Sequence, residues 1–252
     1  IMKNLITITL LLLTLAMPLS AQRTYTLIIG VSRYQNSQHD LAQTASDAKA
    51  FQKVMRHHTQ DINILTSKYA TKDNVINNLS AICKNAGTQD RIIFYFSGHG
   101  TKGGLVAHDG IIYNDQITAI LKTSVAKEIY CFIDACHAGT MANAKADETL
   151  DYNEFIENAK SGKDNMVFFL ASRPEEYSFE NPIIGKGYFT QAMLKGIRGK
   201  SDSNGDKKIT VIELFNYIYK DVQNSVKENP DMRQHPQLIA PKSTHNNVIV
   251  EW

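Results

Sequence analysis

Short apolar stretches alternate along the first half of the chain with stretches of helical spacing. Residues 25–31, 61–66 and 91–97 are predicted strands, because they are rich in β-branched and aromatic residues and the last is apolar almost throughout. Residues 44–57 and 71–85 carry apolar side chains three or four positions apart and are predicted helices. Apolar strands separated by helices indicate a mostly parallel sheet that is covered on both faces.

The second half of the chain continues this pattern. Residues 128–134 and 166–171 are predicted core strands, residues 187–198 and 210–227 are predicted helices, and residues 246–251 are a candidate edge strand. We therefore expect an α/β fold with about six strands in its central sheet.

A hairpin interrupts the alternation at residues 104–113. Its Asp109-Gly110 pair suits a tight turn that needs a positive φ, and Asn114 is positioned to cap a helix that ends at Thr123. A polar stretch of about 30 residues separates the fourth and fifth core strands, and long loops of this kind are usually functional or disordered.

The first 21 residues resemble a secretory signal. Lys3 precedes an apolar run, Leu5 to Leu15, which is well short of the ~20 residues that span a bilayer. The small residue Ala21 offers a cleavage point. We expect residues 1–21 to be removed on export to the periplasm or the medium, leaving no stable membrane anchor and one domain over residues 22–252. An uncleaved anchor helix is the alternative.

Charge and cysteine content narrow the classes of partner. The net charge of +2 falls to +1 without Lys3, so nothing in it indicates a nucleic-acid partner. The 3 cysteines are Cys83, Cys131 and Cys136. An odd, sparse set argues against a disulfide framework and leaves at least one free thiol. Cys83 and Cys131 fall on apolar stripes and are expected in the core.

Two predicted strands end in polar residues that packing does not require. His99 follows the third strand between Gly98 and Gly100, and Cys136 follows the fourth, shortly before Gly139. The carboxyl ends of parallel strands open onto one crevice, so this histidine and this cysteine are expected to converge. Taken singly, each has an ordinary reading, as a solvated turn histidine and a small buried thiol.

His137 is the rival for the general base. Adjacent residues of an extended segment point to opposite faces, so His137 is poorly placed to reach the Cys136 sulfur, and His99 is preferred. The remaining histidines are expected on the surface: His39, His57, His58, His108, His235 and His245.

The chain resembles the caspase-like cysteine peptidases, and among them the metacaspases and their bacterial relatives. The resemblance covers nearly all of residues 22–252 and is anchored on YTLIIGVSRY (25–34), SDA (46–48), YFSGHG (95–100) and DACHAG (134–139). It implies a caspase-like three-layer sandwich, Cys136 as nucleophile and His99 as acid and base. It also implies an oxyanion hole from the backbone N–H groups of Gly100 and Cys136, and no required cofactor.

The resemblance also bears on specificity. Animal caspases hold an acidic substrate residue with arginines, whereas the matching position before the nucleophile here is Asp134. A carboxylate at this position selects a cation. By resemblance to metacaspases, Asp47 and Ser97 line the same pocket, which predicts cleavage after Arg or Lys. The alternative for Asp47 is a helix cap or a solvent-facing side chain. Glu175, Glu176 and Glu180 are also acids of this region, and their part is open.

Residues 202–213 match an EF-hand-type calcium loop except for Lys207 at the sixth position, where glycine is usual. The expected ligands are Asp202, Asn204, Asp206, Lys208, Thr210 and Glu213. The alternative is mechanical, because Thr210 and Glu213 also form a capping box for the next helix.

The polar loop 138–165 contains Lys145, Lys160 and Lys163, which suits self-cleavage by an enzyme that cuts after basic residues. We expect a monomer that acts on peptides or proteins carrying a basic residue. Two alternatives stay open: a caspase-fold binding or scaffold protein without turnover, and a clostripain-like peptidase of the same clan.

Overall fold

The centre of the fold is a six-stranded sheet in the order β12-β8-β7-β3-β1-β2. The computed structural model describes residues 22–101, 103–136, 165–173, 175–181, 185–227, 229 and 231–252. Five strands run parallel: β1 (Thr24–Gly30), β2 (Ile62–Thr66), β3 (Arg91–Ser97), β7 (Glu128–Asp134) and β8 (Met166–Leu170). The edge strand β12 (Gln237–Ile239) pairs antiparallel with β8. The predicted mostly parallel sheet is confirmed.

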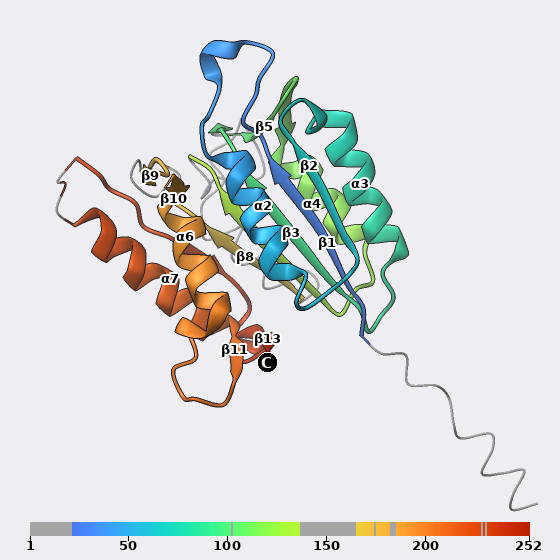
Figure 1. Ribbon diagram of the computed structural model, residues 1–252. Helices are drawn as coiled ribbons and strands as arrows, with labels where there is room; N and C mark the ends of the chain where they lie inside the picture. The colour runs from blue at the N-terminus through green and yellow to red at the C-terminus, as the bar shows by residue number, and fades with distance from the viewer. Residues whose placement is uncertain are drawn as a thin grey trace, which may run out of the picture.

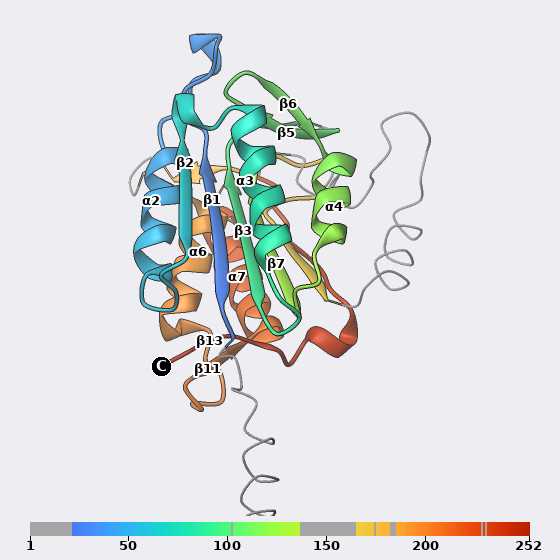
Figure 2. The same cartoon turned by 90° about the vertical axis from the view of Figure 1, so that its right-hand side faces the viewer.

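Helices cover both faces of this sheet, as the two ribbon views show (Figure 1, Figure 2). The helices α3 (Lys72–Asn85) and α4 (Asn114–Thr123) lie on one face. On the other lie α2 (Thr44–Met55), α6 (Tyr188–Lys195) and α7 (Val211–Val226). The layers are therefore helix, sheet and helix, as expected.

Each face has its own hydrophobic core, because successive side chains of a strand point to opposite sides. In β1, Leu27 and Ile29 belong to the core under α3 and α4. Ile28, between them, belongs to the core under α2, α6 and α7, where it joins Phe51 and Phe132. All five side chains are fully buried, so strands that are apolar along their whole length are what this sheet requires.

The register of the sheet sets the level at which its strands end. Gly30 of β1 pairs with Ser97 of β3, and Ser97 pairs with Asp134 of β7. The residues that follow these strands therefore leave the sheet side by side.

Three small sheets surround the central one. The hairpin predicted at residues 104–113 is confirmed as β5 (Gly104–Ala107) and β6 (Gly110–Tyr113), with β4 (Gly100–Thr101) alongside. The strand β9 (Glu180–Asn181) pairs with β10 (Lys186–Gly187), and β11 (Lys208–Thr210) pairs with β13 (Val248–Glu251). Short helical turns complete the described fold: Ser37–His39, Ser67–Tyr69, Gly196–Lys200 and Lys242–Thr244.

Two local predictions are wrong. Asn114 does not cap α4; it is the first helical residue, Tyr113 occupies the cap position, and the Asn114 side chain is buried. The tail strand pairs with β11 and not with the edge of the central sheet, whose antiparallel edge strand is β12.

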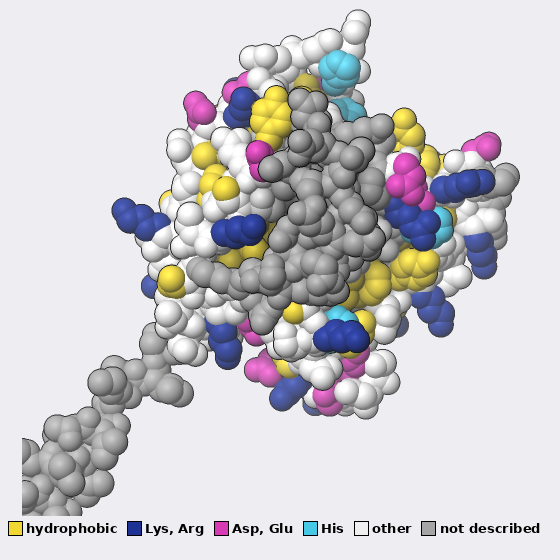
Figure 3. All heavy atoms as spheres, turned by 180° about the vertical axis from the view of Figure 1, so that it is seen from behind, with side chains coloured by type: hydrophobic (Ala, Val, Ile, Leu, Met, Phe, Trp, Pro, Cys, Tyr) yellow, Lys and Arg dark blue, Asp and Glu magenta, His cyan; other side chains and the backbone are white. Residues whose placement is uncertain are grey.

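Some predictions fall on residues that the structure does not describe, namely the signal segment 1–21, His137 and nearly all of the loop 138–165. Within the described part of the chain, no helix has the length and apolarity needed to cross a bilayer. Among the described residues on the face seen in Figure 3, basic side chains are dispersed between acidic and apolar ones.

Candidate active site

Cys136 and His99 lie in one small pocket at the ends of β3 and β7. The pocket has a volume of about 100 Å³. Its lining residues are Leu41, Thr44, Asp47, Ser97, Gly98, His99, Asp134, Ala135, Cys136, Ser178, Phe179 and Gly187. The structure thus brings together the predicted nucleophile, the predicted base and the three predicted specificity residues.

Glycines let the two strand ends approach closely. The Gly98 N–H donates to the Asp134 carbonyl oxygen at 3.2 Å. Gly100 lies so close to Cys136 that a Cβ at position 100 would overlap the Cys136 carbonyl oxygen. Any larger residue would separate the histidine segment from the cysteine segment.

The Gly100 N–H is not part of the hydrogen bonding between β4 and β5. The Val106 N–H donates to the His99 carbonyl oxygen at 2.9 Å, which makes Gly100 and Leu105 a non-hydrogen-bonded pair of the β4–β5 ladder. This pairing does not use the Gly100 N–H, which suits it to hold an oxyanion.

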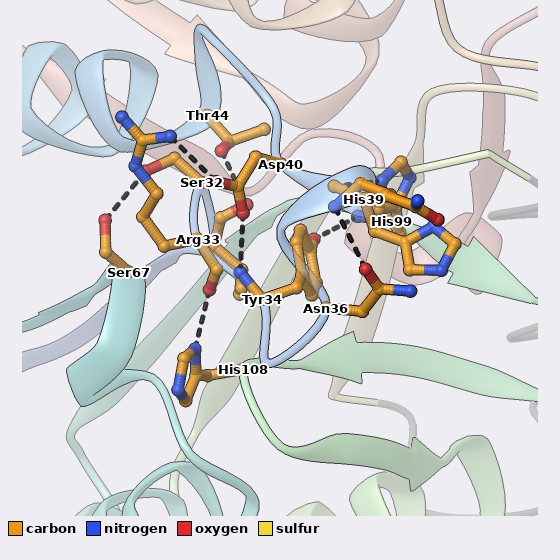
Figure 4. Close-up of polar contacts among 12 residues, drawn as sticks. Ser32, Arg33, Tyr34, Asn36, His39, Asp40, Thr44, Ser67, His99 and His108 are labelled. Atoms are coloured by element: carbon orange, nitrogen blue, oxygen red, sulfur yellow. Dashed lines mark hydrogen bonds and ion pairs between the residues drawn. The ribbon is translucent and has the colours of Figure 1, made fainter.

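The His99 ring is oriented by a backbone carbonyl. Its Nε2 lies 2.8 Å from the His39 carbonyl oxygen (Figure 4). A carbonyl only accepts hydrogen bonds, so Nε2 carries the proton in the neutral ring and Nδ1 is left to accept one. The His39 side chain is exposed, as predicted, and it is the main chain of that residue that serves the site. A main-chain acceptor leaves no signal in the sequence.

Tyr34 supports the same histidine from the main-chain side. Its hydroxyl accepts the His99 N–H at 2.8 Å, and the two ring centroids are 5.0 Å apart. Burial raises the pKa of Tyr34 far above its ordinary value, so the phenol stays neutral. Asp40 holds this loop: it accepts from the Tyr34 N–H at 2.9 Å and pairs with Arg33 at 2.7 Å (Figure 4). The Arg33 hydrogen bond is the main reason that the pKa of Asp40 is lowered.

The thiol of Cys136 is half-buried and lies 3.9 Å from the Ser178 carbonyl oxygen. The other two cysteines are buried, as expected. Burial raises the pKa of Cys83 to about 11 and that of Cys131 further still, so both remain protonated thiols.

Two carboxylates form an acidic hollow beside the thiol. Asp134 is 6% exposed and accepts from the Ser178 hydroxyl at 2.6 Å, the Thr190 hydroxyl at 2.6 Å and the Thr190 N–H at 3.2 Å. Burial raises the pKa of Asp134, while these hydrogen bonds oppose that effect. Ser97, 2% exposed, lines the same hollow.

Asp47 is the second carboxylate. It lies in the first turn of α2, where the helix dipole favours a negative charge, and is only 1% exposed. It accepts the Gly187 N–H at 3.1 Å and faces the Lys186 ammonium at 3.6 Å. The alternatives of a capping or solvent-facing Asp47 do not hold in this structure.

Sequence reasoning did not find the partners of the two carboxylates, which come from the described residues between positions 178 and 190. Ser178, Lys186, Gly187 and Thr190 are ordinary residues whose role appears only when the fold carries them to the ends of β3 and β7. Glu176 does not join the hollow, because it pairs with His235 at 2.6 Å. His235 is half-buried and paired, and His108 and His245 are half-buried as well, so these three histidines are only partly exposed where a surface position was expected.

The loop 202–213 is held by its own hydrogen bonds. Asp202 accepts from the N–H groups of Gly205 and Lys207, at 2.8 and 3.0 Å. Lys207 takes a φ of 64°, so a residue other than glycine does adopt the conformation needed at the sixth position. Thr210 and Glu213 form the capping box of α7.

Among the described residues, no group of three or more His, Cys, Asp or Glu side chains is arranged to hold a metal. The calcium assignment to Asp202, Asn204, Asp206, Lys208, Thr210 and Glu213 stays a prediction.

Comparisons with known proteins agree with this architecture. A family model described as a caspase domain matches residues 23–248. A probable protease from a Desulfuromonadales bacterium is 24% identical over 209 residues, covering 71% of this chain and 25% of the relative. This chain thus spans about a quarter of the length of that protein.

Among solved structures, a Geobacter sulfurreducens protein has a TM-score of 0.62 and 17% identity, covering 89% of this chain and 97% of its own. At this identity the likeness concerns the fold alone.

Proposed function

Because this chain belongs to the caspase-domain family of peptidases, we propose that it is a cysteine endopeptidase that cleaves peptides and proteins after Arg or Lys. The observation that carries the proposal is that Cys136 and His99 line one pocket beside two buried carboxylates. The half-buried thiol contrasts with the fully buried Cys83 and Cys131.

The proposed reaction needs only the chain's own groups. His99 Nδ1 takes the proton of the Cys136 thiol, and the thiolate attacks the substrate carbonyl carbon. The N–H groups of Gly100 and Cys136 hold the resulting oxyanion. His99 then protonates the departing amine, and water, activated by the same imidazole, releases the acyl group and restores the thiol.

Specificity for a cation follows from the charges at the floor of the pocket. Asp47 and Asp134 are buried carboxylates, and a buried acid interacts strongly with an incoming ammonium or guanidinium group. We include in the proposal export through the segment 1–21 and action as a monomer. Calcium is no part of the proposed reaction.

Hydrolysis of fluorogenic peptides ending in Arg, Lys, Asp or an uncharged residue tests the proposal, under reducing conditions, with and without calcium. We expect turnover of the Arg and Lys peptides, loss of at least a thousandfold in Cys136→Ala and His99→Ala, and retained activity in Cys83→Ala, a matched thiol control on α3.

Each alternative has its own result. No turnover of any peptide by a folded protein would favour the binding or scaffold protein. A preference for Asp would contradict the proposed pocket. A clostripain-like peptidase shares the chemistry and differs in lineage.

A further inference from the structure

The acidic hollow already holds a cation of the chain itself. We propose that Lys186 competes with the substrate for Asp47, so that it is a specificity-determining residue of this pocket: the basic side chain of a substrate must displace the Lys186 ammonium before it binds. This inference rests on the proposed preference for Arg or Lys.

The geometry joins Lys186 to Asp47 through two consecutive residues. The Gly187 N–H donates to one oxygen of Asp47 at 3.1 Å, and the Lys186 ammonium lies 3.6 Å from the other. Gly187 also lies against Asp134, because a Cβ at this position would overlap the Asp134 carboxylate. The strand β10 therefore runs between the two acids that are proposed to recognise the substrate.

The excess of negative charge in the pocket makes Lys186 a competitor of a basic substrate side chain. The described residues that line the pocket include Asp47 and Asp134 but no Lys or Arg. Asp134 accepts hydrogen bonds from neutral donors, namely the Ser178 hydroxyl and the Thr190 hydroxyl and N–H. Among the described residues, Lys186 is a cation that reaches Asp47, the nearer acid of this pair, from β10.

The Lys186 ammonium can move away from Asp47 without unfolding its surroundings. Asp47 is 1% exposed, but the Lys186 side chain is 26% exposed and has a flexible stem that lets its ammonium swing into water. Its strand has only two residues and pairs with the two residues of β9. A lysine held at 3.6 Å makes a weaker contact than a guanidinium that binds both oxygens of a carboxylate, so an arginine substrate is the better competitor.

The size of the effect follows from competition. A ligand that binds only the open form has its affinity reduced by the fraction of molecules that are open. With an open fraction on the order of one tenth, removing Lys186 tightens binding of basic substrates by roughly tenfold. The chemistry at Cys136 is the same once the substrate is bound, so kcat is unchanged.

The test compares the wild type with Lys186→Met, which keeps the apolar stem and removes the charge, and with Lys186→Ala. Lys195→Ala is the matched control, since Lys195 is also a half-exposed lysine in an ion pair, with Asp221. We expect a KM for Arg peptides lowered roughly tenfold in both Lys186 variants, unchanged in the control, and unchanged for any uncharged peptide that is cleaved.

Binding without turnover keeps the test independent of catalysis. Agmatine, an arginine analogue without the carboxyl group, is titrated into Cys136→Ala with and without Lys186→Met, and tighter binding is expected in the double variant. In an Asp47→Asn background the Lys186 substitution should have no effect, because the competition acts through that carboxylate.

The two ideas fail in different ways. Wild type that cleaves after Arg, together with folded Lys186 variants whose KM and agmatine affinity stay the same or weaken, would overturn the role of Lys186 and leave the proposed function in place. A wild type and variants that all prefer uncharged or acidic residues would overturn the basic preference itself.

Discussion

At the scale of single residues, the site depends on side chains that orient other groups as much as on those that react. Tyr34 is such a residue, since its buried hydroxyl accepts the main-chain N–H of His99 at 2.8 Å. It touches neither substrate nor the reacting proton in the proposed reaction, and its effect passes through the position of the imidazole.

Tyr34→Phe removes that acceptor and keeps the ring that packs on His99. We expect kcat to fall about tenfold, corresponding to about 1.4 kcal/mol, because the His99 segment loses one hydrogen bond that holds it. KM and the thermal midpoint should change little, and the exposed Tyr113→Phe should leave kcat intact. An unchanged kcat in Tyr34→Phe would show that packing alone positions His99.

Asp134 gives the pocket a pH dependence of its own. Burial raises the pKa of Asp134, so the carboxylate is protonated at a higher pH than an ordinary aspartate as the solution is acidified. Loss of its negative charge weakens attraction for a cation. Affinity for basic ligands should therefore be full at neutral pH and decline on acidification before ordinary carboxylates titrate.

Titration of agmatine into Cys136→Ala across the acid range measures this decline without the chemical step. We expect the decline to persist, from a weaker starting affinity, in Asp47→Asn and to disappear in Asp134→Asn. A decline that is the same in Asp134→Asn would assign it to another group.

At the scale of elements, α7 begins at a complete capping box. The Thr210 hydroxyl accepts the Glu213 N–H, and the Glu213 carboxylate accepts the Thr210 N–H. Thr210→Ala should lower the free energy of unfolding by about 1 kcal/mol, since it leaves donors of the first turn without their acceptor. Urea unfolding measures this, and Ser225→Ala, an exposed change on the same helix, is the control. A loss below about 0.3 kcal/mol would show that packing alone fixes the start of α7.

At the scale of the whole molecule, the sequence predicts the sheet better than it predicts the walls of the site. The strands 91–97 and 128–134 are apolar between their polar first and last residues, and the structure has them at the predicted bounds. The edge strand β12 was missed because three residues carry little periodicity and its pairing depends on the open edge of β8.

The same contrast holds within the candidate site. Cys136 and His99 could be predicted as site residues because each follows an apolar strand, where packing does not require a reactive side chain or neighbouring glycines. The His39 carbonyl and the Lys186 ammonium could not, since one is main chain and the other is an ordinary lysine until the fold sets it against Asp47.

Gln234 shows how distant parts of the chain share the site. It is fully buried and lies before β12, yet its side chain accepts the Phe179 N–H at 3.0 Å and donates to the Ala171 carbonyl and the Ser178 hydroxyl. Ser178 in turn holds Asp134 and lies beside the Cys136 thiol. The C-terminal part of the chain therefore fixes the segment that closes one side of the pocket.

Gln234→Ala leaves several buried polar groups without this partner. We expect a loss of about 2 kcal/mol in the free energy of unfolding, measured in urea, and a higher KM for Arg peptides because Ser178 and Asp134 lose their fixed geometry. Gln116→Ala, at an exposed position of α4, should change neither quantity. Loss of stability without any change in KM would mean that the segment around Ser178 holds its position through Asp134 alone, and that the pocket is assembled independently of the residues that precede β12.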